Sequence, residues 1–218
     1  MTVQKLLDTT HLPLSAGDTA GQALVRLRDE DTQHLPVVDV SGRLIGLVSE
    51  EALEAQVDPS LPLVGLVSGD PVSVAPDTHV FDAAHQMHQH ALSVLPVVDV
   101  TQQYLGLVER QTLFGQLAHM LATEEPGAIV VLDIPRRDYS LGRLVHLVEQ
   151  NDVRILSIAT EDDHAAGVVR VTLKLNVTDT ARVRHLMEHY DYRITAVFDE
   201  SDSDMQSRIE AFLRYLEV

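Results

Sequence analysis

The pattern of apolar residues along the chain repeats once. The run Leu35-Pro36-Val37-Val38-Asp39-Val40 is followed by a second apolar stretch at 44–48, and the matching runs at 95–100 and 105–108 keep the same register. Repeated units of this size indicate a duplicated supersecondary element. The sequence therefore predicts two copies of one unit, in residues 1–60 and 61–123.

Each copy is predicted to hold a β-hairpin between two helices. Proline gives no N–H to a strand ladder, so Pro36 and its counterpart Pro96 are expected to open a strand or to lie on an edge. The valine pairs that follow are too apolar for a strand with one wet face. Ser41-Gly42 is a turn signal, and 101–103 takes the same place without glycine.

Helices are predicted on both sides of each hairpin. Asp18 is a favourable N-cap for a helix that ends near residue 31, and 76–78 is expected to cap its counterpart. After the hairpins, helices are predicted at 49–56 and 109–121. A short strand is predicted at 71–74.

The rest of the chain alternates differently, after a boundary at 123–127. Strands are predicted at 128–134, 153–159, 168–177 and 194–198, and helix faces at 141–148 and 183–190. The order βαββαβ is a recurrent α+β unit, so a domain is expected at 128–200. Residues 201–218 follow helical spacing and would need an apolar partner in their own domain or in a second chain. The predicted fold class is α/β (α+β).

Composition narrows the range of partners. The 218 residues include 33 acidic and 16 basic side chains, for a net charge of −17. This charge disfavours nucleic acid and anionic membranes, which attract cationic surfaces. The chain has no cysteine, which excludes disulfides and thiolate metal sites. The apolar runs are too short to cross a bilayer and no signal peptide is evident, so a cytoplasmic location is expected.

Patterns that could carry catalysis are weak. Residues 185–189 match the H-x-x-E-H pattern of a zinc-peptidase class, but no third ligand or cleft accompanies them, and a solvated helix face is favoured. His85 and His88 could share an ion at i, i+3, although a solvated helix face is again favoured. Arg136-Arg137 is expected to form surface ion pairs. No nucleophile elbow, P-loop or dinucleotide fingerprint occurs, so no enzymatic activity and no metal site are expected.

The doubled Leu-Pro-Val-Val-Asp hairpin, followed by Gly-Leu-Val, resembles the CBS domain. Two CBS-like units in tandem resemble a Bateman module. Residues 128–199 resemble an ACT domain, in element order and in 151–158, which makes this domain ferredoxin-like. The whole resembles the acetoin-utilisation regulatory proteins of bacteria. This resemblance implies a non-catalytic regulator, because CBS pairs bind adenosyl nucleotides between their copies and ACT domains often bind amino acids at a dimer interface.

The CBS nucleotide signature is Gly-x-x-Thr/Ser-x-x-Asp after the second hairpin strand. In the first copy, Gly46 and Ser49 match this signature, but Ala52 replaces the ribose-binding aspartate. In the second copy only Gly106 matches. Glu109 replaces the hydroxyl residue there, and Thr112 replaces the aspartate. A carboxylate there opposes the attraction of a helix N-terminus for phosphate. The resemblance implies a ligand site at His34, Leu35, Pro36, Gly46, Ser49, Gly106 and Thr112.

Two hypotheses follow. In the first, the cleft senses a nucleoside or nucleotide such as AMP, ADP, ATP or S-adenosylmethionine, with no fixed cofactor. In the second, the cleft has degenerated and the protein is a ligand-free scaffold for a partner enzyme or regulator. In the first hypothesis the ACT-like domain and the closing helix are expected to form a homodimer. Asp138-Tyr139 stands where ACT domains usually have a Pro-Gly that admits an amino acid, which favours dimerisation over amino-acid binding.

Overall fold

The computed structural model describes residues 1–56, 58–67 and 71–199. It divides into two compact units, Met1–Leu117 and Ala118–Val218. The helix predicted at 201–218 lies outside the described residues. No described helix has both the length and the apolar character that a membrane crossing requires.

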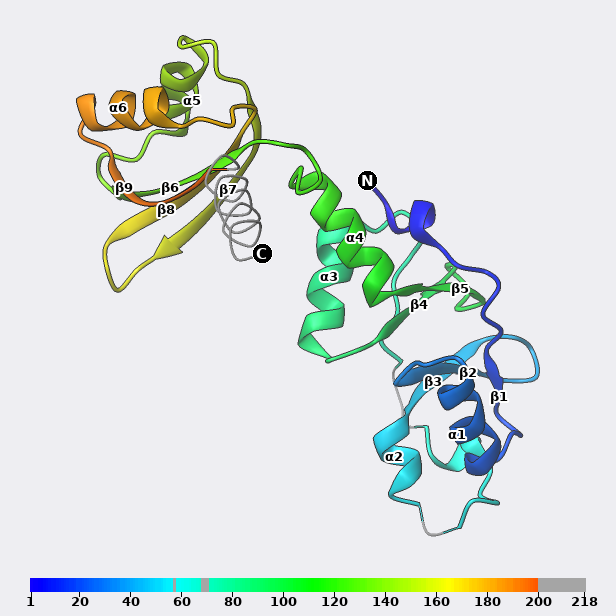
Figure 1. Ribbon diagram of the computed structural model, residues 1–218. Coiled ribbons are helices and arrows are strands. Elements are labelled where there is room, and N and C mark those ends of the chain that lie inside the picture. The colour runs from blue at the N-terminus through cyan, green and yellow to red at the C-terminus, as the bar shows by residue number, and fades with distance from the viewer. Residues whose placement is uncertain (57, 68–70, 200–218) are drawn as a thin grey trace, which may run out of the picture. The chain divides into compact units, whose positions relative to one another are not determined.

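The first unit contains the repeat (Figure 1). Its first half comprises η1 (Val3–Leu6), β1 (Leu14–Ser15), α1 (Ala20–Asp29), β2 (His34–Val38), β3 (Leu44–Ser49) and α2 (Glu50–Glu54). Its second half comprises η2 (Leu63–Gly65), α3 (Val80–Gln89), β4 (Val94–Val98) and β5 (Tyr104–Glu109), and α4 (Arg110–Met120) follows.

The two predicted hairpins are confirmed, and they share one register. Strand β2 pairs antiparallel with β3, and β4 with β5, each with an irregularity between the two valines of the motif. His34 lies opposite Ser49 in one hairpin, and Val94 lies opposite Glu109 in the other. The turns are closed by residues with positive φ, Gly42 at 81° and Gln102 at 65°.

Some predicted boundaries were wrong. Thr19, not Asp18, is the N-cap of α1, and it forms a capping box with Gln22. The Asp18 carboxylate instead accepts the Ser15 N–H at 2.8 Å. Helix α3 begins after His79 rather than after 76–78. The strand predicted at 71–74 is reduced to a single parallel bridge from Val74 to β4.

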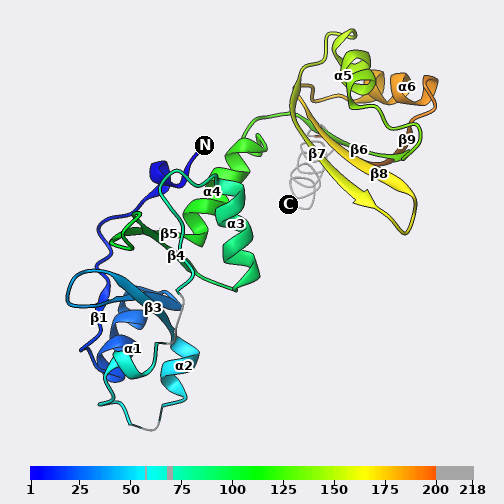
Figure 2. The same cartoon turned by 180° about the vertical axis from the view of Figure 1, so that it is seen from behind.

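The segment at the start of each copy packs into the core of the other copy. Val3 is buried in the cluster built around α3 and the β4–β5 hairpin, whereas Leu63 is buried in the cluster around α1 and the β2–β3 hairpin. Both views show the N-terminal segment passing β5 before β1 joins β2 (Figures 1 and 2). The boundary predicted at residue 60 therefore does not separate two independent cores.

The two signature glycines lie where these exchanged segments cross the hairpins. A Cβ atom on Gly46 would come within 2.6 Å of the Val67 side chain. A Cβ atom on Gly106, whose φ is +150°, would come within 2.3 Å of the backbone oxygen of Asp8. Glycine at position 106 lets two backbone segments approach closely, and glycine at position 46 leaves room for the Val67 side chain,.

The second unit is the predicted βαββαβ fold. It comprises β6 (Ala128–Pro135), α5 (Leu141–Glu149), β7 (Ile155–Asp163), β8 (Val168–Leu175), α6 (Ala181–His189) and β9 (Arg193–Phe198). The antiparallel sheet has the order β7-β8-β6-β9, and both helices cover one face of it (Figure 1). Strand β7 begins later and ends later than the predicted 153–159.

The core of this unit lies between the sheet and its helices. Alternate residues of β6 and β8 are buried there with Leu144 and Met187 from the helices. The intervening residues of β6, including Ile129 and Val131, are only partly buried on the opposite face. Alternation of this kind is typical of an antiparallel sheet packed on one side.

Candidate ligand cleft in the first unit

A cleft of about 830 Å³ lies between the two copies in the first unit. The first copy contributes the end of α1, the loop before β2 and Glu50; the second contributes Ser93, Val94 and the start of α4. The loop before β2 and the loop before β4 are equivalent in the repeat. A hollow of this size lies within the range of small-molecule sites.

The residues implied by the nucleotide signature lie around this cleft rather than on its surface. Leu35 and Pro36 are buried within β2, and Gly46 and Gly106 are buried beneath the exchanged segments. Thr112 is exposed on α4. Within the described part of the chain, the lining is formed instead by neighbours of the implied residues, namely Gln33, Glu50, Ser93, Glu109, Arg110 and Gln111.

Ser49 is used as a helix cap. Its Oγ accepts the backbone N–H of Ala52 at 3.2 Å and so begins α2. This hydrogen bond satisfies one N–H of the first turn of α2. The cap places Glu50, the first residue of α2, at the cleft.

His34 connects the two copies. Its Nδ1 lies 3.1 Å from Ser93 Oγ and accepts the Ser93 N–H at 3.3 Å. Because Nδ1 accepts a backbone proton, the ring is neutral and protonated on Nε2. Burial, and then the charge of Arg110, lowers the pKa of His34. The partner Ser93 was missed from the sequence, because no local pattern there distinguishes it from any other loop serine.

The family comparison agrees with this arrangement. The sequence model of the CBS domain matches residues 5–54 and 64–119. The chain therefore contains two CBS domains. Its first unit is a tandem CBS pair, as the repeated hairpins predicted.

Solved structures share this fold. A CBS domain pair/ACT domain protein from Thermotoga maritima is 25% identical with a TM-score of 0.52, and the match covers 56% of this chain and 99% of that one. The acetoin utilization protein AcuB from Vibrio cholerae is 24% identical with a TM-score of 0.50, covering 57% of this chain and 95% of that one.

Curated relatives include much longer proteins. Inosine-5'-monophosphate dehydrogenase of Korarchaeum cryptofilum is 23% identical over 164 residues, which is 75% of this chain. The chain spans 34% of the length of that relative.

The lining of the CBS cleft carries more acidic than basic groups. Glu30, Asp31, Glu50 and Glu109 face it, against Arg28 and Arg110. The Arg28 guanidinium is already paired with Glu54 at 2.7 Å and Glu50 at 3.4 Å, and these bonds raise its pKa. Arg110 donates to the backbone oxygens of Ala91 and Leu92 at 3.0 and 2.8 Å. The charge of Arg28 is therefore already paired with two carboxylates, whereas Arg110 is held by backbone oxygens only.

The second unit holds a separate cavity of about 500 Å³. It lies beside α5 and β9 and is lined by polar groups that include Asp138, Arg143 and His146. Tyr139 packs against the core of this unit. Arg136 and Arg137, predicted as ion-pair partners, contact Asp162 at 2.5 Å and Asp138 at 3.3 Å, which confirms that prediction.

Proposed function

We propose that this protein is a non-catalytic regulatory module that senses an adenosine-containing small molecule between its two CBS domains. The observation that supports this proposal is the cleft itself, which equivalent segments of both domains enclose. A ligand bound there contacts both domains at once. It therefore favours one relative arrangement of the domains in proportion to its difference in affinity for the two.

The charge of the lining ranks the candidate ligands. Glu50 and Glu109 stand beside the starts of α2 and α4, where a phosphate would otherwise be attracted,. Each added phosphate raises the repulsion, whereas the sulfonium and amino groups of S-adenosylmethionine are attracted. The expected order of affinity is S-adenosylmethionine, AMP, ADP and then ATP.

Thermal unfolding of the full chain tests this function. A ligand that binds the folded form raises Tm by mass action, so S-adenosylmethionine should give the largest shift. Gln111→Trp places a large ring in the cleft lining and should abolish that shift. Gln116→Trp, on the same helix but outside the lining, should retain it. Unchanged melting with all four ligands would contradict the sensing function.

A second candidate function is a ligand-free scaffold. It is supported by Ala52 and Thr112, which stand at the two ribose-binding positions, and by the Ser49 hydroxyl, which already caps α2. This function requires a recurrent partner enzyme or regulator that none of the four ligands displaces. Affinity capture with and without ligand separates the two candidates.

The ACT-like unit is proposed to form the homodimer. The partly buried apolar residues on the sheet face opposite α5 and α6, Ile129 and Val131, support this role. A monomeric mass from light scattering at micromolar concentration would contradict it.

A further inference from the structure

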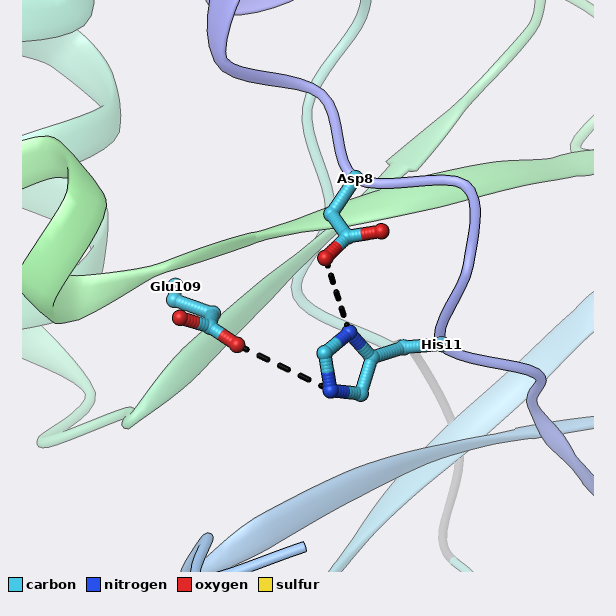
Figure 3. Close-up of side chains that lie close together, drawn as sticks. All are labelled: Asp8, His11 and Glu109. Carbon is cyan, nitrogen blue, oxygen red and sulfur yellow. Dashed lines mark hydrogen bonds and ion pairs between the residues drawn. The ribbon is translucent and has the colours of Figure 1, made fainter.

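A compact group of side chains lies at the point where the N-terminal segment crosses β5. Nδ1 of His11 is 2.9 Å from Oδ2 of Asp8, and Nε2 of the same ring is 3.7 Å from Oε1 of Glu109 (Figure 3). Oε2 of Glu30 is 4.0 Å from that Nε2. Both nitrogens of one imidazole thus face carboxylates. Among the described residues, Asp8, His11 and Glu109 are the one group whose spacing suits a metal ion.

We propose that His11 and Glu109 of this group, together with Glu30, bind a divalent transition-metal ion such as zinc through Nε2 of His11 and the two carboxylates. Zinc lies about 2.1 Å from nitrogen and oxygen ligands, so two ligands of one ion are at most about 4.2 Å apart. The distances of 3.7 and 4.0 Å from Nε2 satisfy this limit. Closing the site requires the Glu30 and Glu109 carboxylates to rotate toward each other, because Glu30 is not part of the group whose ligand atoms all lie within 4.8 Å of one another.

Glu30 provides the second observation. Its Oε1 is held by the Arg26 guanidinium at 2.6 Å. Its Oε2 is shielded from solvent and has no hydrogen-bond partner among the described residues. A shielded carboxylate oxygen without a partner is costly, and a cation between it and His11 would remove that cost.

Asp8 positions the histidine. Its Oδ2 accepts the proton of His11 Nδ1, which leaves the lone pair of Nε2 for the ion. Its Oδ1 is fixed by the N–H and hydroxyl of Thr10 at 2.6 and 2.7 Å. Carboxylates in this position orient metal-binding histidines and raise their basicity.

The backbone around the group is well held. Asp8 exchanges both backbone hydrogen bonds with Leu107, at 2.8 and 3.0 Å, Glu109 ends β5, and Glu30 is the C-cap of α1. An ion here would join segments of both CBS domains at one edge of the cleft. An imidazole ligand favours zinc, cobalt or nickel over magnesium and calcium.

Zinc titration of the full chain, dialysed against EDTA and followed by calorimetry, tests this site. One equivalent should bind, and Co²⁺ in its place should give the visible absorption of a four-coordinate ion. His11→Gln and Glu109→Gln should each weaken binding at least about 100-fold. Asp8→Asn should weaken it about 10-fold, the lower end of the effect of an outer carboxylate.

The matched control is the double variant His85→Gln/His88→Gln, which removes two exposed histidines from α3. It should bind zinc as the wild type does. Absence of stoichiometric zinc binding in the wild type, unchanged affinity in both His11→Gln and Glu109→Gln, or loss of binding in the α3 variant would each overturn the proposal. Circular dichroism confirms that each variant is folded, and Glu109→Gln changes a partly exposed side chain that the core does not need.

Discussion

The two CBS domains of this chain share a backbone but differ in the chemistry at equivalent positions. Both hairpins have the same pairing and the same irregularity between their valines. Ser49 caps a helix of five residues in the first domain, whereas Glu109 precedes a helix of eleven in the second. His34 in one domain corresponds to Val94 in the other. Apolar positions are thus constrained by the core, while polar positions at the cleft have diverged.

The signature glycines give the sharpest test of that difference. In Gly106→Ala the new Cβ meets the Asp8 backbone and φ is +150°. Overpacking and backbone strain each cost about 1–3 kcal/mol, so a loss of about 4 kcal/mol is expected. In Gly46→Ala the new Cβ meets the Cβ of Val67, which moves only with its own backbone, but no positive φ adds strain, so a loss of about 1–3 kcal/mol is expected,. Urea unfolding measures both, and equal losses would show that the two crossings do not differ.

The exchanged segments predict the next largest effect. Leu63 is fully buried in the core of the first domain, so Leu63→Ala should cost about 3 kcal/mol,. Val64, its neighbour in η2, is 59% exposed, and Val64→Ala should cost less than about 0.5 kcal/mol,. Because each domain holds a segment of the other, the CBS pair should unfold in one transition. Two separate transitions for Leu63→Ala would contradict this coupling.

The smallest predicted effect concerns pH. The pKa of His34 is lower in the folded chain than in the unfolded chain, where it is about 6.5,. Below about pH 6.5 the unfolded chain therefore binds a proton at His34 that the folded chain does not bind. This contribution to stability is complete above that pH and is lost as pH falls below it. His34→Val introduces the residue of the second domain and should reduce the loss of stability between about pH 7.5 and pH 5.5. An equal loss in both proteins would show that His34 is not its source.

The sequence predicted the hairpins, the α+β fold class and the family because β-branched runs and turn residues act locally. It failed where the outcome depends on distant partners. Asp18 and Thr19 are both favourable N-cap residues. Thr19 is the N-cap because Gln22, three residues later, completes a capping box with it. The residues that flank Val3 and Leu63 in the sequence do not indicate against which hairpin each of them packs. His34 was predicted as a site residue, but its hydrogen bonds to Ser93 depend on how the two domains meet.

The crossing of Asp8 over β5 has a consequence for how the chain folds during synthesis. The bonds between Asp8 and Leu107 join residues near opposite ends of the CBS pair. During synthesis on the ribosome, the segment around Asp8 must therefore stay without its hydrogen-bond partners until β5 has emerged. Contacts between residues so distant along a chain slow folding. Until they form, the apolar residues that precede Asp8 stay exposed, and chaperones bind exposed apolar segments of this kind.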